Sequence, residues 1–211
     1  MAADDKIDLA ATRRRMLAAT IAVLPLAALA WLALYFWTPP VPGSEDPVNR
    51  FGFALSWVCI AVLLTLVSGI EAVAHERLFT PAIDPLAGRE SRRLRINLRY
   101  LQNTLEQIAV FVPALLLLAW QAGDGFEMRA VTATAIVWMA LRFVFWIGYH
   151  RAPELRAPGL VGFALAMIVL IAGIARFGYQ YAGWPGALAP LLIFGAIEAY
   201  LVWISLRAGR G

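Results

Sequence analysis

The chain has 211 residues, of which 61% are hydrophobic and only 15% are charged. A soluble domain is roughly half apolar and about a quarter charged, so this composition excludes an ordinary soluble protein and indicates an integral membrane protein. The formal charge is +4, and the single cysteine, Cys59, excludes a disulfide within the chain, so we interpret it as a small buried hydrophobe.

Six apolar runs follow one another, and each is near the roughly 20 residues that a helix needs to cross a hydrocarbon core of about 30 Å. They are residues 16–37, 51–74, 98–120, 130–149, 160–177 and 185–206. The first run follows three arginines in an N-terminal tail, residues 1–15. It is longer than a signal-peptide core and ends in aromatic residues, so we interpret it as a retained helix.

Charge in the loops predicts the orientation of these runs. Basic residues gather in the tail with Lys6, in the loops before the third and fifth runs, and after the last run at Arg207 and Arg210. The loops of the other side carry few, namely Arg50, Arg129 and Arg176. Because loops rich in lysine and arginine stay in the cytoplasm, we expect six spans with both termini inside.

Three polar residues open the third run, at Arg99, Asn103 and Glu106. Their offsets of four and seven residues place them on one face of a helix. Ionisable groups in a spanning segment are costly and normally face a protein interior or a cavity with a partner. We therefore interpret this stripe as one wall of a binding site.

The fourth run carries Arg142 at a depth comparable to that of Glu106, and Tyr149 lies two turns later. An arginine at that depth needs an acidic partner, so we expect Arg142 and Glu106 to face each other, directly or through a ligand. His75, Glu76 and Arg77 close the second run on the same side, and Arg156 precedes the fifth. Such a pocket suits a small zwitterionic ligand, because arginine grips carboxylates, and it suits a thiol, because a nearby arginine stabilises the thiolate.

These stretches resemble a known family, the membrane-associated proteins in eicosanoid and glutathione metabolism (MAPEG). Arg99-x-x-x-Asn103-x-x-Glu106 is similar to the signature that opens the family's second helix. Arg142-x-x-Phe145-x-x-Gly148-Tyr149, followed by Arg151 and Arg156, looks like the end of its third helix and the start of its fourth. The resemblance covers residues 51–178 and leaves 16–37 and 185–206 as extra transmembrane helices.

The resemblance implies an all-α membrane protein whose four-helix bundle forms a homotrimer and binds glutathione on the cytoplasmic side, between helices or subunits. It implies a glutathione transferase or peroxidase acting on a lipophilic electrophile from the bilayer. The alanine- and arginine-rich, lysine-poor composition separately suggests a bacterial protein, for which we expect the inner membrane as the location. Arg156 would stabilise the thiolate, and the tripeptide would be held by Arg99, Asn103, Glu106, Arg142, Tyr149 and Arg151. The chain departs from some members at Phe145, where they have tyrosine or histidine, and at Gln107, where they have tyrosine.

A second hypothesis comes from another class of protein. Arg99 is equally compatible with a residue at the membrane interface, and Tyr149 with the aromatic belt found at that interface. Arg151 and Arg156 are equally compatible with basic loop residues that only set the membrane orientation. On that interpretation the chain is a non-catalytic membrane protein, transporter-like or an assembly factor, with a structural polar network. Neither hypothesis involves a metal or nucleic acid, because His75, His150 and Cys59 cannot form a metal cluster and no nucleic-acid module is visible.

Overall fold

The computed structural model describes residues 9–208, and they are almost entirely helical. The long helices are α1 (Leu9–Trp37), α2 (Pro47–Ala61), α3 (Ser68–Leu78), α4 (Arg92–Gln121), α5 (Arg129–Arg151) and α6 (Ala157–Ala208). Short helical segments lie at Val62–Val67, Pro81–Ile83 and Pro153–Arg156. Lys6 and Arg210, two residues that support the predicted orientation, lie outside the described residues.

Five helical stretches among the described residues are long and apolar enough to cross a membrane. Each of the first four contains one predicted apolar run, and α2 and α3 form one continuous rod through the π-helical turn Val62–Val67. The fifth and sixth predicted runs both lie on α6. The first run becomes part of a longer helix, since α1 already includes residues 9–15 of the predicted tail.

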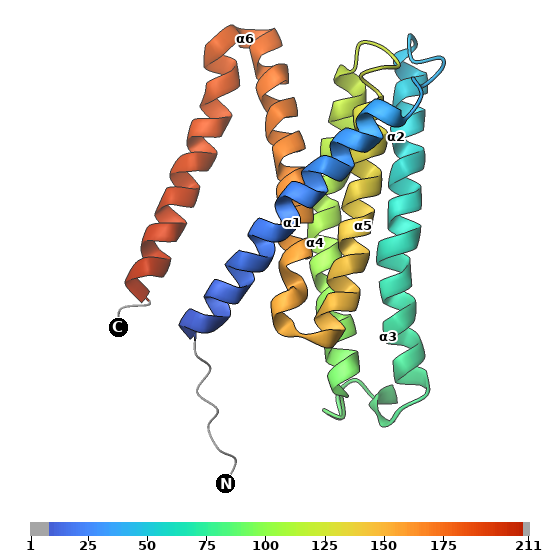
Figure 1. Cartoon of the computed structure of the whole chain (residues 1–211), viewed down its shortest axis with the longest axis vertical. Coiled ribbons are helices and arrows are strands. Elements are labelled where there is room, and N and C mark those ends of the chain that lie inside the picture. Colours follow the sequence, from blue (N-terminus) through green and yellow to red (C-terminus); the bar gives the residue numbers. More distant parts are fainter. Residues whose placement is uncertain (1–8, 209–211) are drawn as a thin grey trace.

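The rod of α2 and α3, with α4, α5 and the first arm of α6, forms a bundle of roughly parallel helices (Figure 1). Its core lies between α2, α4, α5 and α6, where Phe111 stacks on Trp138 with the ring centroids 4.2 Å apart. Cys59 is exposed on the outside of α2, so its interpretation as a buried residue is wrong. A helix that is apolar all round does not reveal which of its faces points inward.

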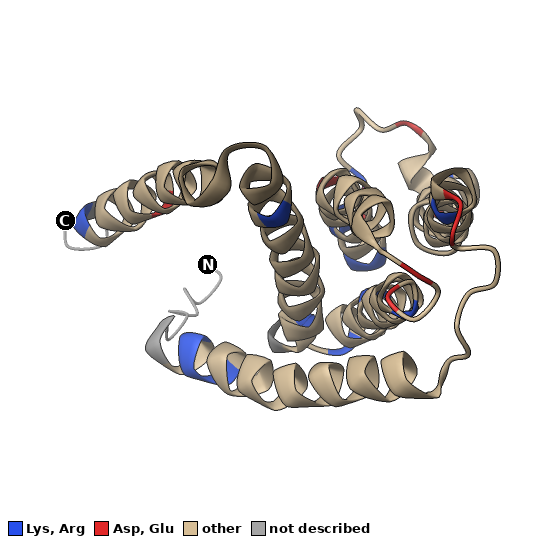
Figure 2. Ribbon diagram, turned by 90° about the horizontal axis from the view of Figure 1, so that it is seen from above, with Lys and Arg blue, Asp and Glu red and all other residues tan. Residues whose placement is uncertain are grey.

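Helix α6 turns back on itself at Ala182 and Gly183 (Figure 1). Gly183 has a φ of +61°, a conformation that glycine adopts without strain. Beside the turn, a Cβ on Gly178 would lie 2.2 Å from the carbonyl oxygen of Gly186, so the two arms meet there only because both residues are glycines. Seen from above, the second arm, residues 184–208, lies apart from α3, α4 and α5 (Figure 2).

Helix α1 crosses the bundle obliquely (Figure 1). Val23, Ala27 and Leu34 pack against buried apolar side chains of α5 and α6. The Nε1 atom of Trp31 donates a hydrogen bond to the hydroxyl oxygen of Thr134 on α5 at 3.0 Å. This helix therefore has a defined place on the bundle, which matters for the site described next.

Candidate functional site

A cavity of about 410 Å³ opens at the end of the bundle where α4 begins and α5 ends. Residues of α4 form its polar side, and the end of α5 and the start of α6 form the opposite side. The start of α1 completes it. The lining residues are Met16, Arg99, Gln102, Asn103, Glu106, Gln107, Phe145, Tyr149, Arg156, Gly159 and Leu160.

The polar stripe of α4 lies along one wall of this cavity. A serine cap starts the helix, since the hydroxyl of Ser91 accepts a hydrogen bond from the backbone N–H of Leu94. From there the helical repeat carries Arg99, Asn103 and Glu106 onto the cavity wall. Arg99 and Glu106 are exposed, so their charges are accessible to a ligand.

Gln102 links the two charged residues of the stripe. Arg99 Nη1 donates to Gln102 Oε1, and Gln102 Nε2 donates to Glu106 Oε1, each at 3.1 Å. Gln102 is a lining residue that was not predicted, although its position three residues after Arg99 and four before Glu106 places it on the same helix face. The stripe is thus a connected row of cation, amide and carboxylate.

Arg142 does not pair with Glu106 directly. Its side chain is fully buried, and among the described residues no ion pair joins the two. Arg142 Nη1 donates to Asn103 Oδ1 and Nη2 donates to the hydroxyl oxygen of Thr104, each at 2.8 Å. Of the two predicted arrangements, the direct pair is wrong, because α5 turns the guanidinium toward the bundle interior whereas Glu106 faces the open cavity. Contact through a ligand stays a prediction.

The buried guanidinium of Arg142 has two further features. It lies over the rings of Tyr100 and Phe145, with its central carbon 5.2 and 4.6 Å from the ring centroids. Such cation–π contacts offset part of the cost of burying the charge. Its Nε has no hydrogen-bond partner in the structure. Arg142 is not part of the cavity lining; it supports the lining from behind through Asn103.

The orientation of the Asn103 amide follows from its neighbours. Its Oδ1 accepts from Arg142 Nη1 at 2.8 Å and from Gln107 Nε2 at 3.3 Å. Gln107 Nε2 also donates to the backbone carbonyl of Gly159 at 2.8 Å, which connects α4 to α6. Because the oxygen is occupied by donors, the NH₂ group of Asn103 is the part that remains for a ligand.

Two aromatic residues form the α5 side of the cavity. Tyr149 stacks on Phe145 with the ring centroids 5.6 Å apart, and Phe145 in turn stacks on Tyr100 at 5.9 Å. Gly159 allows α6 to approach, since a Cβ there would lie 3.0 Å from the Phe145 ring. The stacked rings of Phe145 and Tyr100 therefore hold the Tyr149 side chain in place.

Arg156 ends the short segment Pro153–Arg156, and its exposed side chain lines the cavity opposite α4. Its Nε donates to the sulfur of Met16 at 3.1 Å. Arg151, by contrast, is exposed at the end of α5 and is not among the lining residues. The structure therefore brings Arg99, Asn103, Glu106, Tyr149 and Arg156 to one cavity, with Arg142 behind it and Arg151 outside it.

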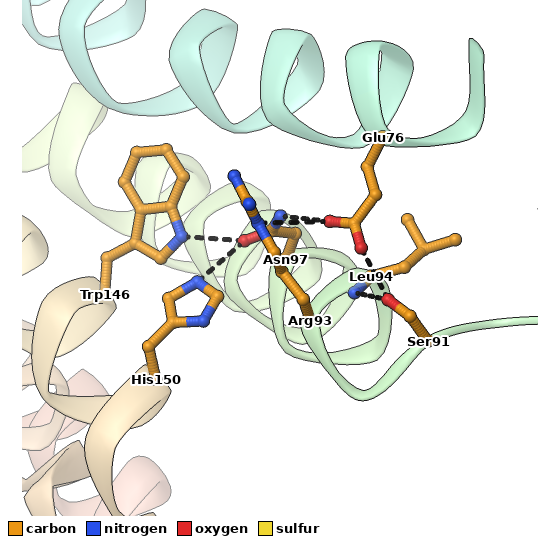
Figure 3. A network of polar contacts seen from close by, with 7 residues as sticks. All are labelled: Glu76, Ser91, Arg93, Leu94, Asn97, Trp146 and His150. Carbon is orange, nitrogen blue, oxygen red and sulfur yellow. Dashed lines mark hydrogen bonds and ion pairs between the residues drawn. The ribbon is translucent and has the colours of Figure 1, made fainter. Parts of the chain in front are cut away.

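A second polar network lies beside the cavity and centres on the buried Asn97 of α4 (Figure 3). Asn97 Nδ2 donates to Glu76 of α3 at 3.2 Å, so its Oδ1 faces α5. There it accepts from Trp146 Nε1 and bonds His150 Nε2, each at 3.0 Å. Because a carbonyl oxygen only accepts, His150 carries its proton on Nε2 in this contact. Sequence analysis missed Asn97, which precedes the polar stripe.

We expect Asn97→Leu to lower the free energy of unfolding by about 2–3 kcal/mol, because it leaves the half-buried donors of Trp146 and His150 without their acceptor. The measurement is thermal unfolding of the purified protein in detergent. Asn49→Leu is the matched control, since Asn49 is exposed and its side chain donates to the Gly43 carbonyl at the surface. Equal melting temperatures for the two variants would contradict a structural role for Asn97.

Comparison with known proteins places this geometry in context. The sequence model of the MAPEG family matches residues 53–178, which is more than half of the chain. The match includes every helix that lines the cavity except α1. No curated protein and no solved structure matches the chain at the significance required.

Proposed function

The chain belongs to the MAPEG family, and from this and the cavity we propose that it is a membrane-bound enzyme that uses glutathione as a thiol substrate against a lipophilic electrophile. The observation that carries the proposal is the convergence of Arg99, Asn103, Glu106, Tyr149 and Arg156 on a single open cavity. These residues come from three different parts of the chain. A merely interfacial or topological role for each would not require them to meet.

The cavity fits the chemistry of glutathione, which has two carboxylates, one ammonium group and one thiol. Arg99 is an accessible guanidinium for a carboxylate, and Glu106 is an accessible carboxylate for the ammonium group. The free NH₂ of Asn103 and the phenol of Tyr149 are suited to hydrogen bonds with the peptide groups. Arg142, one layer behind, adds positive potential and holds Asn103 in place.

Arg156 is our candidate for the catalytic residue. A guanidinium near the thiol lowers the cost of the thiolate, which is the nucleophile, and the thiol proton passes to solvent. With a conjugation substrate, the thiolate sulfur bonds to an electrophilic carbon while that carbon's bond to its leaving group breaks and the leaving group takes the electron pair. With a lipid peroxide, the thiolate sulfur bonds to the terminal peroxide oxygen while the O–O bond breaks, and the alkoxide that leaves takes a proton from solvent to become the alcohol. The resulting sulfenic acid reacts with a second glutathione to give the disulfide and water.

We propose the same membrane arrangement as the charge pattern predicts: six spans with both termini in the cytoplasm, assembled as a homotrimer. Two features support the topology. The turn at Ala182 and Gly183 divides α6 into two arms, each about as long as a span. The first described residues of α1 and the last of α6 lie toward the end of the bundle where α4 begins and α5 ends (Figure 1), and the cavity lining comes from that end. Glutathione would then enter from the cytosol and the electrophile from the bilayer.

The test is a thermal shift in detergent with and without glutathione. A ligand that binds only the folded state stabilises it by about 2.7 kcal/mol at 100 times its dissociation constant. We expect millimolar glutathione to raise the melting temperature of the wild type, with sodium glutamate at equal ionic strength as the solution control.

Variants test whether the glutathione-induced rise in melting temperature comes from binding in this cavity. We expect Glu106→Gln to reduce the glutathione-induced shift, because the carboxylate for the ammonium group is lost. Glu127→Gln is the matched control, since Glu127 lies at the opposite end of the bundle, where it pairs with Arg176. An absent shift at millimolar glutathione would instead support the non-catalytic membrane protein described above.

A further inference from the structure

Helix α1 contributes to the cavity although it lies outside the region that defines the family. The family match covers residues 53–178, whereas Met16 belongs to α1. Among the described residues that line the cavity, Met16 is the one that comes from outside the match. Its sulfur accepts a hydrogen bond from Arg156 Nε at 3.1 Å. The extra helix therefore touches the guanidinium that we assign to the thiolate.

The position of Met16 is set by packing further along α1. Val23 and Ala27, two and three turns later on the same face, pack against the buried Leu141 and Val161. The Trp31–Thr134 hydrogen bond holds α1 one turn beyond those contacts. Pro25 interrupts the backbone hydrogen bonds of α1, but Val23 lies on the Met16 side of it, two turns from Met16. The packing of Val23 therefore positions the turns that carry Met16 to the mouth of the cavity.

The cavity is divided in polarity. Its α4 wall carries Arg99, Gln102, Asn103 and Glu106. The apolar lining residues Met16, Phe145 and Leu160, which we call the apolar end, come from α1, α5 and α6. Arg156 lies at this apolar end, in contact with Met16. A ligand with its charged groups on the α4 wall and its sulfur near Arg156 would leave the apolar end free beside the sulfur.

We propose that Met16, Phe145 and Leu160 form the subsite for the apolar part of the electrophilic substrate, and that Met16 determines which substrates fit. The class of substrate is a short alkyl chain or a single ring attached to the reacting centre. This inference rests on the proposed function, since it assigns the second substrate of the same site. A methionine suits this role because its flexible thioether adapts to ligands of different shape.

The experiment measures dissociation constants of glutathione and S-hexylglutathione by calorimetry on the purified full-length protein. The hexyl chain places apolar carbons where a substrate would stand, directly on the sulfur. For the wild type we expect S-hexylglutathione to bind at least about tenfold more tightly than glutathione, since each buried methylene gains roughly threefold to fourfold. The ratio of the two constants is the readout.

Met16→Trp fills the apolar end, and we expect it to lower this ratio at least fivefold. Met16→Leu, which keeps the volume, retains the ratio. Met16→Ala enlarges the apolar end and shifts the preference from the hexyl to the octyl derivative, which tests the inference should the tryptophan variant fail to fold. Leu17→Trp is the matched control, because Leu17 is the exposed neighbour of Met16 on α1 and does not line the cavity.

Two results would overturn the inference, and they differ. If the wild type binds glutathione but Met16→Trp and Met16→Ala show the wild-type ratio and chain-length preference, the subsite is wrong and the proposed function stands. If neither ligand binds the wild type, the proposed function fails and the subsite fails with it.

Discussion

Replacing Arg142 with alanine is expected to lower the free energy of unfolding by about 3–5 kcal/mol, the range seen when large buried side chains are truncated. The side chain is fully buried and packs over the Tyr100 and Phe145 rings, so its loss leaves a cavity and removes two cation–π contacts. For a chain of this length the melting temperature should fall by roughly 10 °C. Thermal unfolding in detergent measures the change.

The variant Arg142→Met separates the contribution of side-chain volume to stability from the contribution of the positive charge. Methionine fills much of the space, and the oxygens that Arg142 releases keep other partners. The Thr104 hydroxyl still donates to the Tyr100 carbonyl, and Asn103 Oδ1 still accepts from Gln107. We therefore expect Arg142→Met to melt closer to the wild type than Arg142→Ala does, while its glutathione-induced thermal shift is smaller. An alanine variant as stable as the wild type would contradict the packing role.

Replacing Arg156 with alanine is expected to reduce glutathione-transferase turnover about 10²–10³-fold, the range observed when one group that stabilises developing charge is removed. Arg156 is exposed, so its loss should change the melting temperature little. The measurement is steady-state turnover on a chromogenic electrophile, with the pH dependence recorded. If Arg156 stabilises the thiolate, the pH at which turnover rises should move upward in the variant.

Arg156→Lys and Arg176→Ala complete this experiment. Lysine keeps the positive charge but not the planar guanidinium, so partial activity is expected. Arg176 is also a surface arginine of α6, but it pairs with Glu127 at the far end of the bundle, and its loss should leave turnover within twofold. Unchanged turnover in Arg156→Ala would refute the catalytic assignment even if glutathione binds.

Helix positions could be predicted from the sequence because the bilayer imposes them. A segment that crosses hydrocarbon must satisfy its own backbone hydrogen bonds and be apolar over about 20 residues, so the apolar runs mark the helices directly. The same argument could not show that the helical arms that carry residues 160–177 and 185–206 fold back against each other across a sharp turn. That depends on how Ala182 and Gly183 turn the backbone, and on the close approach of Gly178 and Gly186.

The polar stripe of α4 could be predicted from the sequence for a related reason. Residues four and seven apart share a helix face, so Arg99, Asn103 and Glu106 had to lie together once α4 was a helix. The hydrogen-bond partner of Arg142 could not be predicted from the sequence. Sequence sets the depth of a residue along its own helix, but the rotation of α5 against α4 decides whether it meets Glu106 or Asn103, and packing selected Asn103.

The sequence by itself determined that the chain is a helical membrane protein, because composition and apolar length act locally. Its motifs also resembled the MAPEG family, to which the chain belongs. The tertiary structure alone decided which of the predicted site residues face one cavity. It placed Arg142 behind the cavity and Arg151 outside it, and it brought Met16 from a distant helix against Arg156. Such contacts depend on how the faces of separate helices pack, and no local pattern along the chain encodes that rotation.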